Sequence, residues 1–104
     1  MSKSIISNEP RCFRCWTTKN LHRHHIFSNG YRDKAEKYGC WVYLCQEHHT
    51  GKEGVHSAGG RQYWNYLKKI AKSHFVTLYG EELFEKEFKG AYIERTKNYD
   101  RNTE

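Results

Sequence analysis

The chain has 104 residues, the length of one domain, and a domain this short often needs a stabilising device such as a bound metal. It contains no run of about 18 apolar residues, so we expect no membrane span, and its first residues lack the apolar core of a secretory signal. Lys and Arg outnumber Asp and Glu by 18 to 12, and the net charge of +6 favours an anionic partner, nucleic acid above all.

The N-terminal half predicts a polar arm followed by two strands that flank a short helix. Residues 1–10 are polar, and we expect them to be flexible. Leu21–Phe27 predicts a strand, and the Ser-Asn-Gly turn after it leads into a short charged helix over Arg32–Tyr38, which Gly39 ends. Cys40–Cys45 is rich in β-forming residues and predicts the second strand.

The C-terminal half predicts helices separated by a glycine-rich loop. A helix begins over Gln46–Thr50, and the loop after it can pass close to a ligand or a phosphate backbone. Apolar residues from Arg61 to Gly80 follow the i, i+3, i+4 spacing of an amphipathic helix, and Glu81–Lys89 predicts another. The expected organisation is a flexible arm over 1–10, a single α+β domain over 11–95 with a helical extension over about 61–92, and a polar tail over 96–104.

Four Cys and seven His in so short a chain indicate metal ligands in a reducing cytoplasm rather than disulfides. Cys12 and Cys15 have two residues between them, as do Cys45 and His48. Two such pairs supply the four ligands that tetrahedral zinc prefers. Two alternatives are unrelated thiols in a reduced core and a redox Cys pair; charged neighbours disfavour the first, and the lack of a βαβ pattern disfavours the second.

A second set of histidines remains when His48 is assigned to zinc. His24 and His25 are adjacent at the end of the first expected strand, and His49 and His56 surround the short helix. A lone His is usually structural, but four in one small unit indicate chemistry. One imidazole of an adjacent pair can bind a divalent metal while its neighbour takes a proton from water.

These segments resemble the HNH endonucleases of the ββα-metal superfamily, in particular small phage or prophage proteins with a zinc knuckle. The resemblance rests on Leu21–Ile26 (LHRHHI) and Leu44–His49 (LCQEHH), framed by Cys12 and Cys15. Gly54–His56 (GVH) and Phe88–Tyr92 (FKGAY) extend it. The match covers about residues 11–56, and more loosely the chain to Tyr92.

The resemblance implies a small ββα-metal core and a role for each residue. His24 and His49 take the places of the ligands of a catalytic Mg²⁺, Mn²⁺, Ni²⁺ or Zn²⁺, and His56 is an additional ligand at a seven-residue offset, longer than one helical turn. His25 takes the place of the general base. The structural zinc ligands would be Cys12, Cys15, Cys45 and His48, with His48 in place of the more usual fourth Cys.

The chain departs from the family at one position. The middle Asn of the motif usually lies five residues before Cys45, and that position is Cys40 here. A thiol cannot make the same amide hydrogen bonds, so the loop between the strands must be organised by other groups. Asn29 is one candidate.

The predicted partner is DNA inside a bacterial host, and the expected activity is cutting or nicking of phosphodiester bonds. Basic residues around the core and on the long helix are expected to contact phosphates: Arg23, Arg32, Lys68, Lys69 and Lys72. Two other function classes stay open. One is a zinc-stabilised nucleic-acid-binding or adaptor protein with an inactive HNH core. The other is a module that binds a phage or host protein through aromatics such as Tyr31 and Tyr99.

Overall fold

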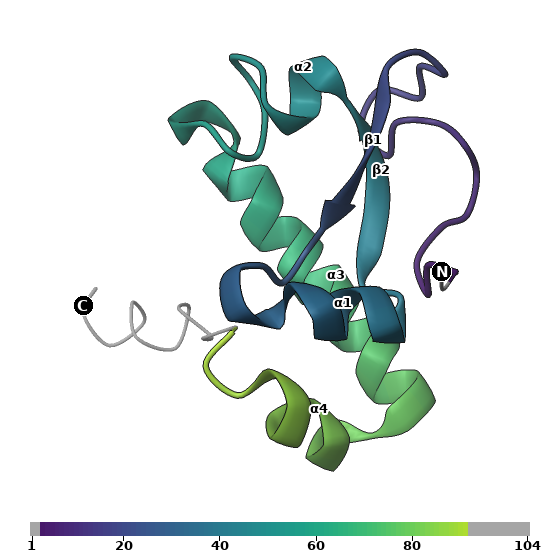
Figure 1. Ribbon diagram of the computed structural model, residues 1–104, viewed down its shortest axis with the longest axis vertical. Helices are drawn as coiled ribbons and strands as arrows, with labels where there is room; N and C mark the ends of the chain where they lie inside the picture. The colour runs from purple at the N-terminus through teal and green to yellow at the C-terminus, as the bar shows by residue number, and fades with distance from the viewer. Residues whose placement is uncertain (1–2, 92–104) are drawn as a thin grey trace.

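A two-stranded sheet with helices around it forms the part of the chain that the computed structural model describes, residues 3–91 (Figure 1). The elements in chain order are β1 (Leu21–His25), α1 (Arg32–Tyr38), β2 (Trp41–Cys45), α2 (Gln46–His49), α3 (Arg61–Tyr79) and α4 (Glu81–Phe88), with 3₁₀ turns at Asn29–Tyr31 and Ala58–Gly60. This is a small mixed domain of the expected α+β class. The polar tail over 96–104, Tyr92 and Tyr99 lie outside the described residues.

The register of the sheet decides which way each functional side chain points. β1 and β2 are antiparallel, with Leu21 opposite Cys45 and His25 opposite Trp41. Because side chains alternate along a strand, His22 and His24 share one face of the sheet, and Arg23 and His25 share the other. His24 is buried, with 1% of its surface exposed.

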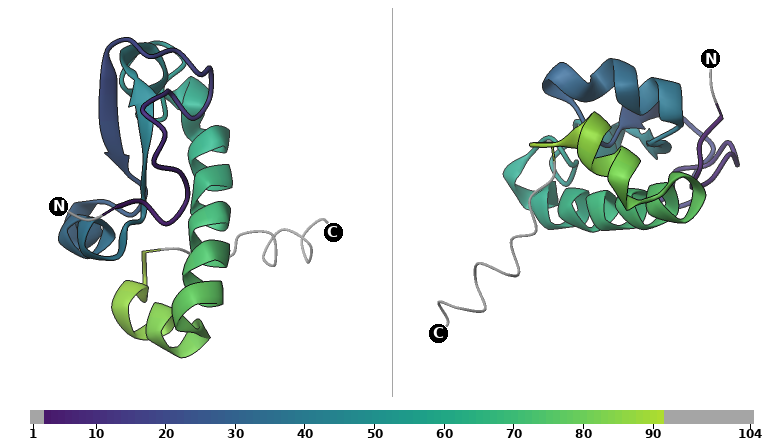
Figure 2. Two further views of the ribbon diagram at one scale, coloured as in Figure 1. Left: turned by 90° about the vertical axis from the view of Figure 1, so that its right-hand side faces the viewer. Right: turned by 90° about the horizontal axis from the view of Figure 1, so that it is seen from below.

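Helix α3 covers the face of the sheet that carries His24. Figure 2 shows it running along the strands, with α4 folded back between α3 and α1. Phe75 of α3 and the α4 residues Phe84 and Phe88 pack as an aromatic cluster, with ring centroids 5.4–5.6 Å apart. The indole Nε1–H of Trp64 donates a 2.8 Å hydrogen bond to the Ile26 carbonyl, which ties the start of α3 to the end of β1.

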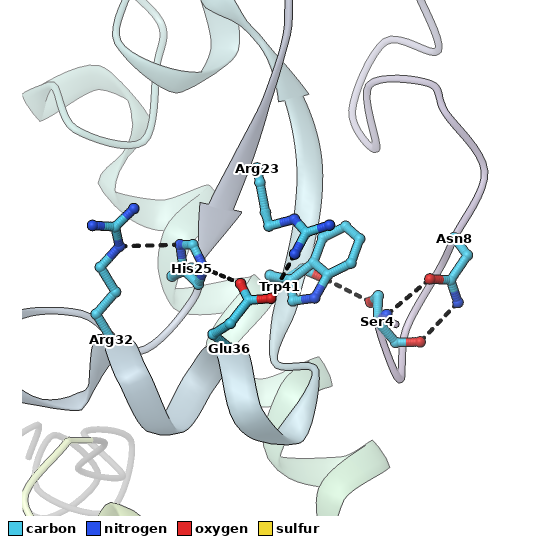
Figure 3. Close-up of polar contacts among 7 residues, drawn as sticks. All are labelled: Ser4, Asn8, Arg23, His25, Arg32, Glu36 and Trp41. Carbon is cyan, nitrogen blue, oxygen red and sulfur yellow. Dashed lines mark hydrogen bonds and ion pairs between the residues drawn. The ribbon is translucent and has the colours of Figure 1, made fainter. Parts of the chain in front are cut away.

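Part of the segment expected to be a flexible arm packs against the sheet instead. The Ser4 hydroxyl donates a 2.6 Å hydrogen bond to the Trp41 carbonyl (Figure 3). The Ile5 N–H donates to the Gly39 carbonyl at 2.9 Å. Ser4 is buried, and Ile5 and Ile6 pack against the core. Within residues 3–91, no helix is both long enough and apolar enough to cross a membrane.

The turn between α1 and β2 allows a direct test of this packing. Gly39 has a φ of +75°, and a Cβ there would lie 2.2 Å from the Lys3 carbonyl oxygen. We expect Gly39→Ala to lower the free energy of unfolding by about 1–3 kcal/mol, because the backbone strains or the N-terminal segment leaves the sheet. Urea denaturation of the metal-loaded protein measures this change.

Gly30→Ala is the matched control, because no atom lies within 4 Å of a Cβ at that position and Gly30 is not among the positive-φ glycines of the described chain. Equal midpoints for the two variants would contradict the packing of residues 3–6 against this turn.

Candidate functional site

Two clusters of side chains that could bind a metal lie next to each other, because the adjacent residues His48 and His49 belong to one each. The first brings together the four side chains of the expected zinc knuckle, Cys12, Cys15, Cys45 and His48. The Cys15 and Cys45 sulfurs are 3.9 Å apart, and His48 Nδ1 lies 3.4 Å from the Cys45 sulfur and 3.7 Å from that of Cys12. Ligands about 2.3 Å from one tetrahedral ion lie roughly 3.8 Å apart, so this cluster could hold a metal ion.

The electrostatics of the first cluster favour a thiolate. Burial opposes ionisation of Cys12, but hydrogen bonds from the backbone N–H groups of Cys15, Cys45 and Arg14 and from the His48 side chain lower its pKa to about 6. Burial raises the pKa of Cys45, and its two neighbouring sulfurs add to the rise. A cation between the sulfurs would offset this repulsion, because metal-bound Cys is deprotonated.

The second cluster is formed by His24 from β1, His49 from α2 and His56 from the loop after α2. One ring nitrogen of each lies within 4.8 Å of the others. The ring centroids are 4.8–5.5 Å apart. Trp64 packs its indole edge-on against both His24 and His56, at 5.0 and 4.9 Å. The three imidazoles therefore form one group, and the Trp64 ring packs against two of them.

The seven-residue offset of His56 is bridged by a loop rather than by helix. Helix α2 has only four residues, and the chain then folds back so that the His56 N–H donates to the His49 carbonyl at 3.2 Å. The fold-back depends on a close approach of two glycines, since a Cβ at Gly60 would lie 2.1 Å from the Gly54 carbonyl oxygen. Helical spacing alone could not have placed His56 in this cluster.

Burial lowers the pKa of two of the three histidines and leaves one ring nitrogen without a partner. It lowers the pKa of His24 to about 3, helped by the nearby His49 and His56, and that of His49 to about 4. His24 Nε2 is fully buried and has no hydrogen-bond partner among residues 3–91. An orphaned buried nitrogen is costly. A metal bound by neutral imidazoles would satisfy it, so the residues present fit such an ion.

His25 lies outside this cluster, on the other face of β1. Its Nε2 is 2.7 Å from a Glu36 carboxylate oxygen, and its Nδ1 is 3.4 Å from the Arg32 Nε (Figure 3). A charge on His25 would nevertheless be felt at the cluster, because His25 is among the groups that lower the pKa of His24 and of His49. The expected base His25 and the expected ligand His24 are therefore adjacent near the end of β1 but point to opposite faces of the sheet.

Two contacts at the site were not anticipated from the sequence. Glu36, on α1, pairs with both His25 and Arg23. His22 lies 3.0 Å from His49, measured between their Nδ1 atoms. The alternation of a strand could have placed His22 beside His24, but nothing in the spacing of Glu36 indicates its partner.

The expected DNA-binding residues occupy different settings. Arg23 contacts Glu36 at 2.6 Å and stacks over the Trp41 ring at 3.8 Å, so its guanidinium is engaged within the fold. Arg32 is exposed beside His25. The Lys68 ammonium lies over the Trp64 ring at 5.1 Å, next to the histidines.

The other two lysines of α3 differ from Lys68. Lys69 is exposed, one residue and therefore about 100° around the helix from Lys68. The Lys72 ammonium pairs with Glu81 at 3.5 Å. The three lysines thus do not share one environment.

Cys40, at the position of the family Asn, is fully buried and belongs to neither cluster. Burial raises the pKa of its thiol to about 12. Within the described chain the Asn29 side chain makes no hydrogen bond, so Asn29 does not replace the missing amide. The inter-strand segment is held instead by the Trp64 bond and by the Cys40 carbonyl, which accepts from the Ile26 N–H at 3.0 Å.

Comparisons with protein families, with curated proteins and with solved structures find no match for this chain.

Two of the three buried cysteines, Cys12 and Cys40, should respond differently to removal. If the first cluster holds zinc, we expect Cys12→Ser to lower the zinc content and, by several kcal/mol, the free energy of unfolding, because a small knuckle of this kind would depend on its ion. Cys40→Ala should keep the zinc and lose only packing energy. Metal content by plasma emission, with a melting curve of each variant, gives both quantities. Full zinc content in Cys12→Ser would contradict the assignment.

Proposed function

We propose that this protein is a metal-dependent endonuclease of the HNH type that hydrolyses or nicks DNA. The observation that carries the proposal is the second cluster: three imidazoles converge with a buried, partnerless nitrogen, and a fourth imidazole is held by a carboxylate at the same strand end. The net charge of +6 suits a polyanionic substrate.

The second cluster would bind the catalytic cation through His24, His49 and His56. A divalent ion there would withdraw charge from the scissile phosphate and stabilise the leaving oxygen. His25 would accept a proton from the attacking water. Arg32 and Lys68, on either side of this end of the sheet, would hold the flanking phosphates.

The imidazole ligands of the second cluster favour some of the candidate divalent ions over others. The cluster within residues 3–91 contains three imidazoles and no carboxylate. Mg²⁺ prefers oxygen ligands, whereas imidazole suits Ni²⁺ and Zn²⁺. We therefore propose Ni²⁺ or Zn²⁺, ahead of Mn²⁺ and Mg²⁺, as the ions that support activity.

The first cluster would have a structural task with zinc as its ion. Cys12 and Cys15 lie in the N-terminal turns, while Cys45 and His48 span the junction of β2 and α2. A closed four-ligand shell does no chemistry, but it would anchor α2. Since His49 follows His48 directly, this anchor would also hold His49 in the second cluster.

A nucleic-acid-binding protein with an inactive core is the second candidate. Two observations favour it: Cys40 supplies no amide where the family has Asn, and His25 points to the face opposite His24. A supercoiled-plasmid assay separates the two candidates, with Ni²⁺, Zn²⁺, Mn²⁺ or Mg²⁺ added in turn and EDTA as the control. Nicked or linear plasmid that depends on the cation supports the enzyme, and binding without any cutting supports the rival.

Single substitutions of the adjacent histidines should separate ligand from base. We expect His24→Ala to weaken binding of the second metal, so that raising the metal concentration partly restores cleavage. His25→Ala should retain the metal but cut roughly 10²–10⁴-fold more slowly, the usual contribution of a positioned general base. Rates from plasmid gels and Ni²⁺ affinities from titration calorimetry give the comparison.

The roles are reversed if His25→Ala loses the metal while His24→Ala keeps it. Wild-type cleavage by His25→Ala would remove His25 from the chemistry altogether. DNA binding should survive in both variants, which serves as the internal control for folding.

Salt dependence should show which cations touch phosphate. We expect Arg32→Ala and Lys68→Ala each to reduce the slope of log affinity against log salt by about one, because each removes one phosphate contact. Lys72→Ala is the matched control, since its ammonium already pairs with Glu81. Fluorescence anisotropy with a short duplex at several salt concentrations measures the slopes. Equal slopes for all three variants and wild type would place DNA on another surface.

A further inference from the structure

Glu36 connects helix α1 to the end of β1 through its two carboxylate oxygens. Oε1 lies 2.7 Å from Nε2 of His25, and Oε2 lies 2.6 Å from a guanidinium nitrogen of Arg23 (Figure 3). Arg23 is itself stacked on Trp41 at 3.8 Å. The carboxylate is therefore held from both sides, and only a small rotation of the His25 ring is compatible with its bond.

We infer that Glu36 is the positioning residue of the proposed reaction: it fixes the ring and the tautomer of His25 so that Nδ1 is the nitrogen that accepts the proton. This inference rests on the proposed function. An ionised carboxylate only accepts hydrogen bonds, so the Nε2 that faces it must carry a hydrogen. The lone pair of the neutral ring is then on Nδ1.

The surroundings of Nδ1 agree with this assignment. The Arg32 Nε–H faces Nδ1 across 3.4 Å, which agrees with an Nδ1 that carries a lone pair rather than a hydrogen. Figure 3 shows Arg32 and Glu36 on opposite sides of the His25 ring. Arg32 is exposed and Glu36 is half-buried, so Nδ1 is the nitrogen on the side from which a phosphate and its attacking water would arrive.

In the proposed reaction, Nδ1 of His25 takes one proton from the attacking water. Arg32 would turn from Nδ1 to the flanking phosphate, which frees the Nδ1 lone pair. The water oxygen forms the new bond to phosphorus, the bond from phosphorus to the leaving oxygen breaks with its electron pair on that oxygen, and one water proton moves to Nδ1. The resulting imidazolium is stabilised by Glu36, which remains ionised and takes no proton. The proton on Nδ1 then passes to solvent or to the leaving oxygen, which restores the neutral ring. An orienting carboxylate has this same task in hydrolytic His–Asp pairs.

The tautomer can be read without any cleavage assay. In the zinc-loaded full chain, ¹⁵N-resolved imidazole spectra should show His25 with its hydrogen on Nε2 and a deshielded, unprotonated Nδ1. Glu36→Ala should produce a mixture of tautomers for His25. A wild-type His25 with its hydrogen on Nδ1 would overturn the inference.

Cleavage rates at saturating metal then test the catalytic consequence. We expect Glu36→Gln to cut about 10–10³-fold more slowly, with unchanged Ni²⁺ affinity, and Glu36→Asp to recover part of the loss. Asp33→Asn is the matched control, because it removes the same charge from an exposed position of the same helix and should cut like wild type.

A double-mutant comparison separates positioning from a merely structural link between α1 and β1. If Glu36 acts through His25, Glu36→Gln causes no further loss in a His25→Ala background. An equal fold-loss in both backgrounds would mean that Glu36 only stabilises the fold, and the inference would fail. If the wild type cuts DNA and Glu36→Gln cuts it equally fast, the inference about Glu36 fails but the proposed function stands. If the wild type cuts with none of the metals, the proposed function fails as well.

Discussion

The pairing of β1 with β2 is the constraint on which the candidate site depends. Because adjacent side chains of a strand point to opposite faces, the register that buries His24 must also turn His25 toward α1. A shift of one residue would exchange the two imidazoles and put Arg23 and His25 under α3. The register is held by the burial of Val42 and Leu44 on β2 and by the Trp64 bond to the Ile26 carbonyl just beyond β1.

The two clusters are mechanically coupled through α2. His48 belongs to the first cluster and His49 to the second, and only one peptide separates them. Metal binding by the Cys-rich cluster would therefore order the helix that carries His49, before any second ion is bound. The loop that returns His56 is anchored on the same helix, through the Val55 N–H bond to the His48 carbonyl at 3.0 Å. A short chain can in this way support a site that its small apolar core alone would hold loosely.

Much of this arrangement was predictable from the sequence because it depends on local spacing. The helix over Arg61–Tyr79 follows from its apolar periodicity, and the two ligand pairs of the knuckle follow from two-residue spacers. His56 was expected as a ligand from the set of histidines and the family resemblance, but its position depends on how a glycine loop folds, and the Glu36 pair depends on how α1 packs against β1. Both are tertiary facts with no local signal. Ser4 is similar, since its polar neighbours predicted a flexible arm but its hydroxyl bonds to the buried start of β2.

We propose that a second metal centre, made of imidazoles alone, lies beside the Cys-rich cluster. X-ray absorption at the nickel edge, on zinc-loaded protein to which one equivalent of Ni²⁺ is added, tests it most directly. We expect retained nickel with nitrogen and oxygen neighbours, outer-shell scattering from three imidazoles and no sulfur. Nickel bound to sulfur, or nickel that washes away from the zinc-loaded wild type, would contradict a separate histidine centre and the hydrolytic chemistry proposed for it.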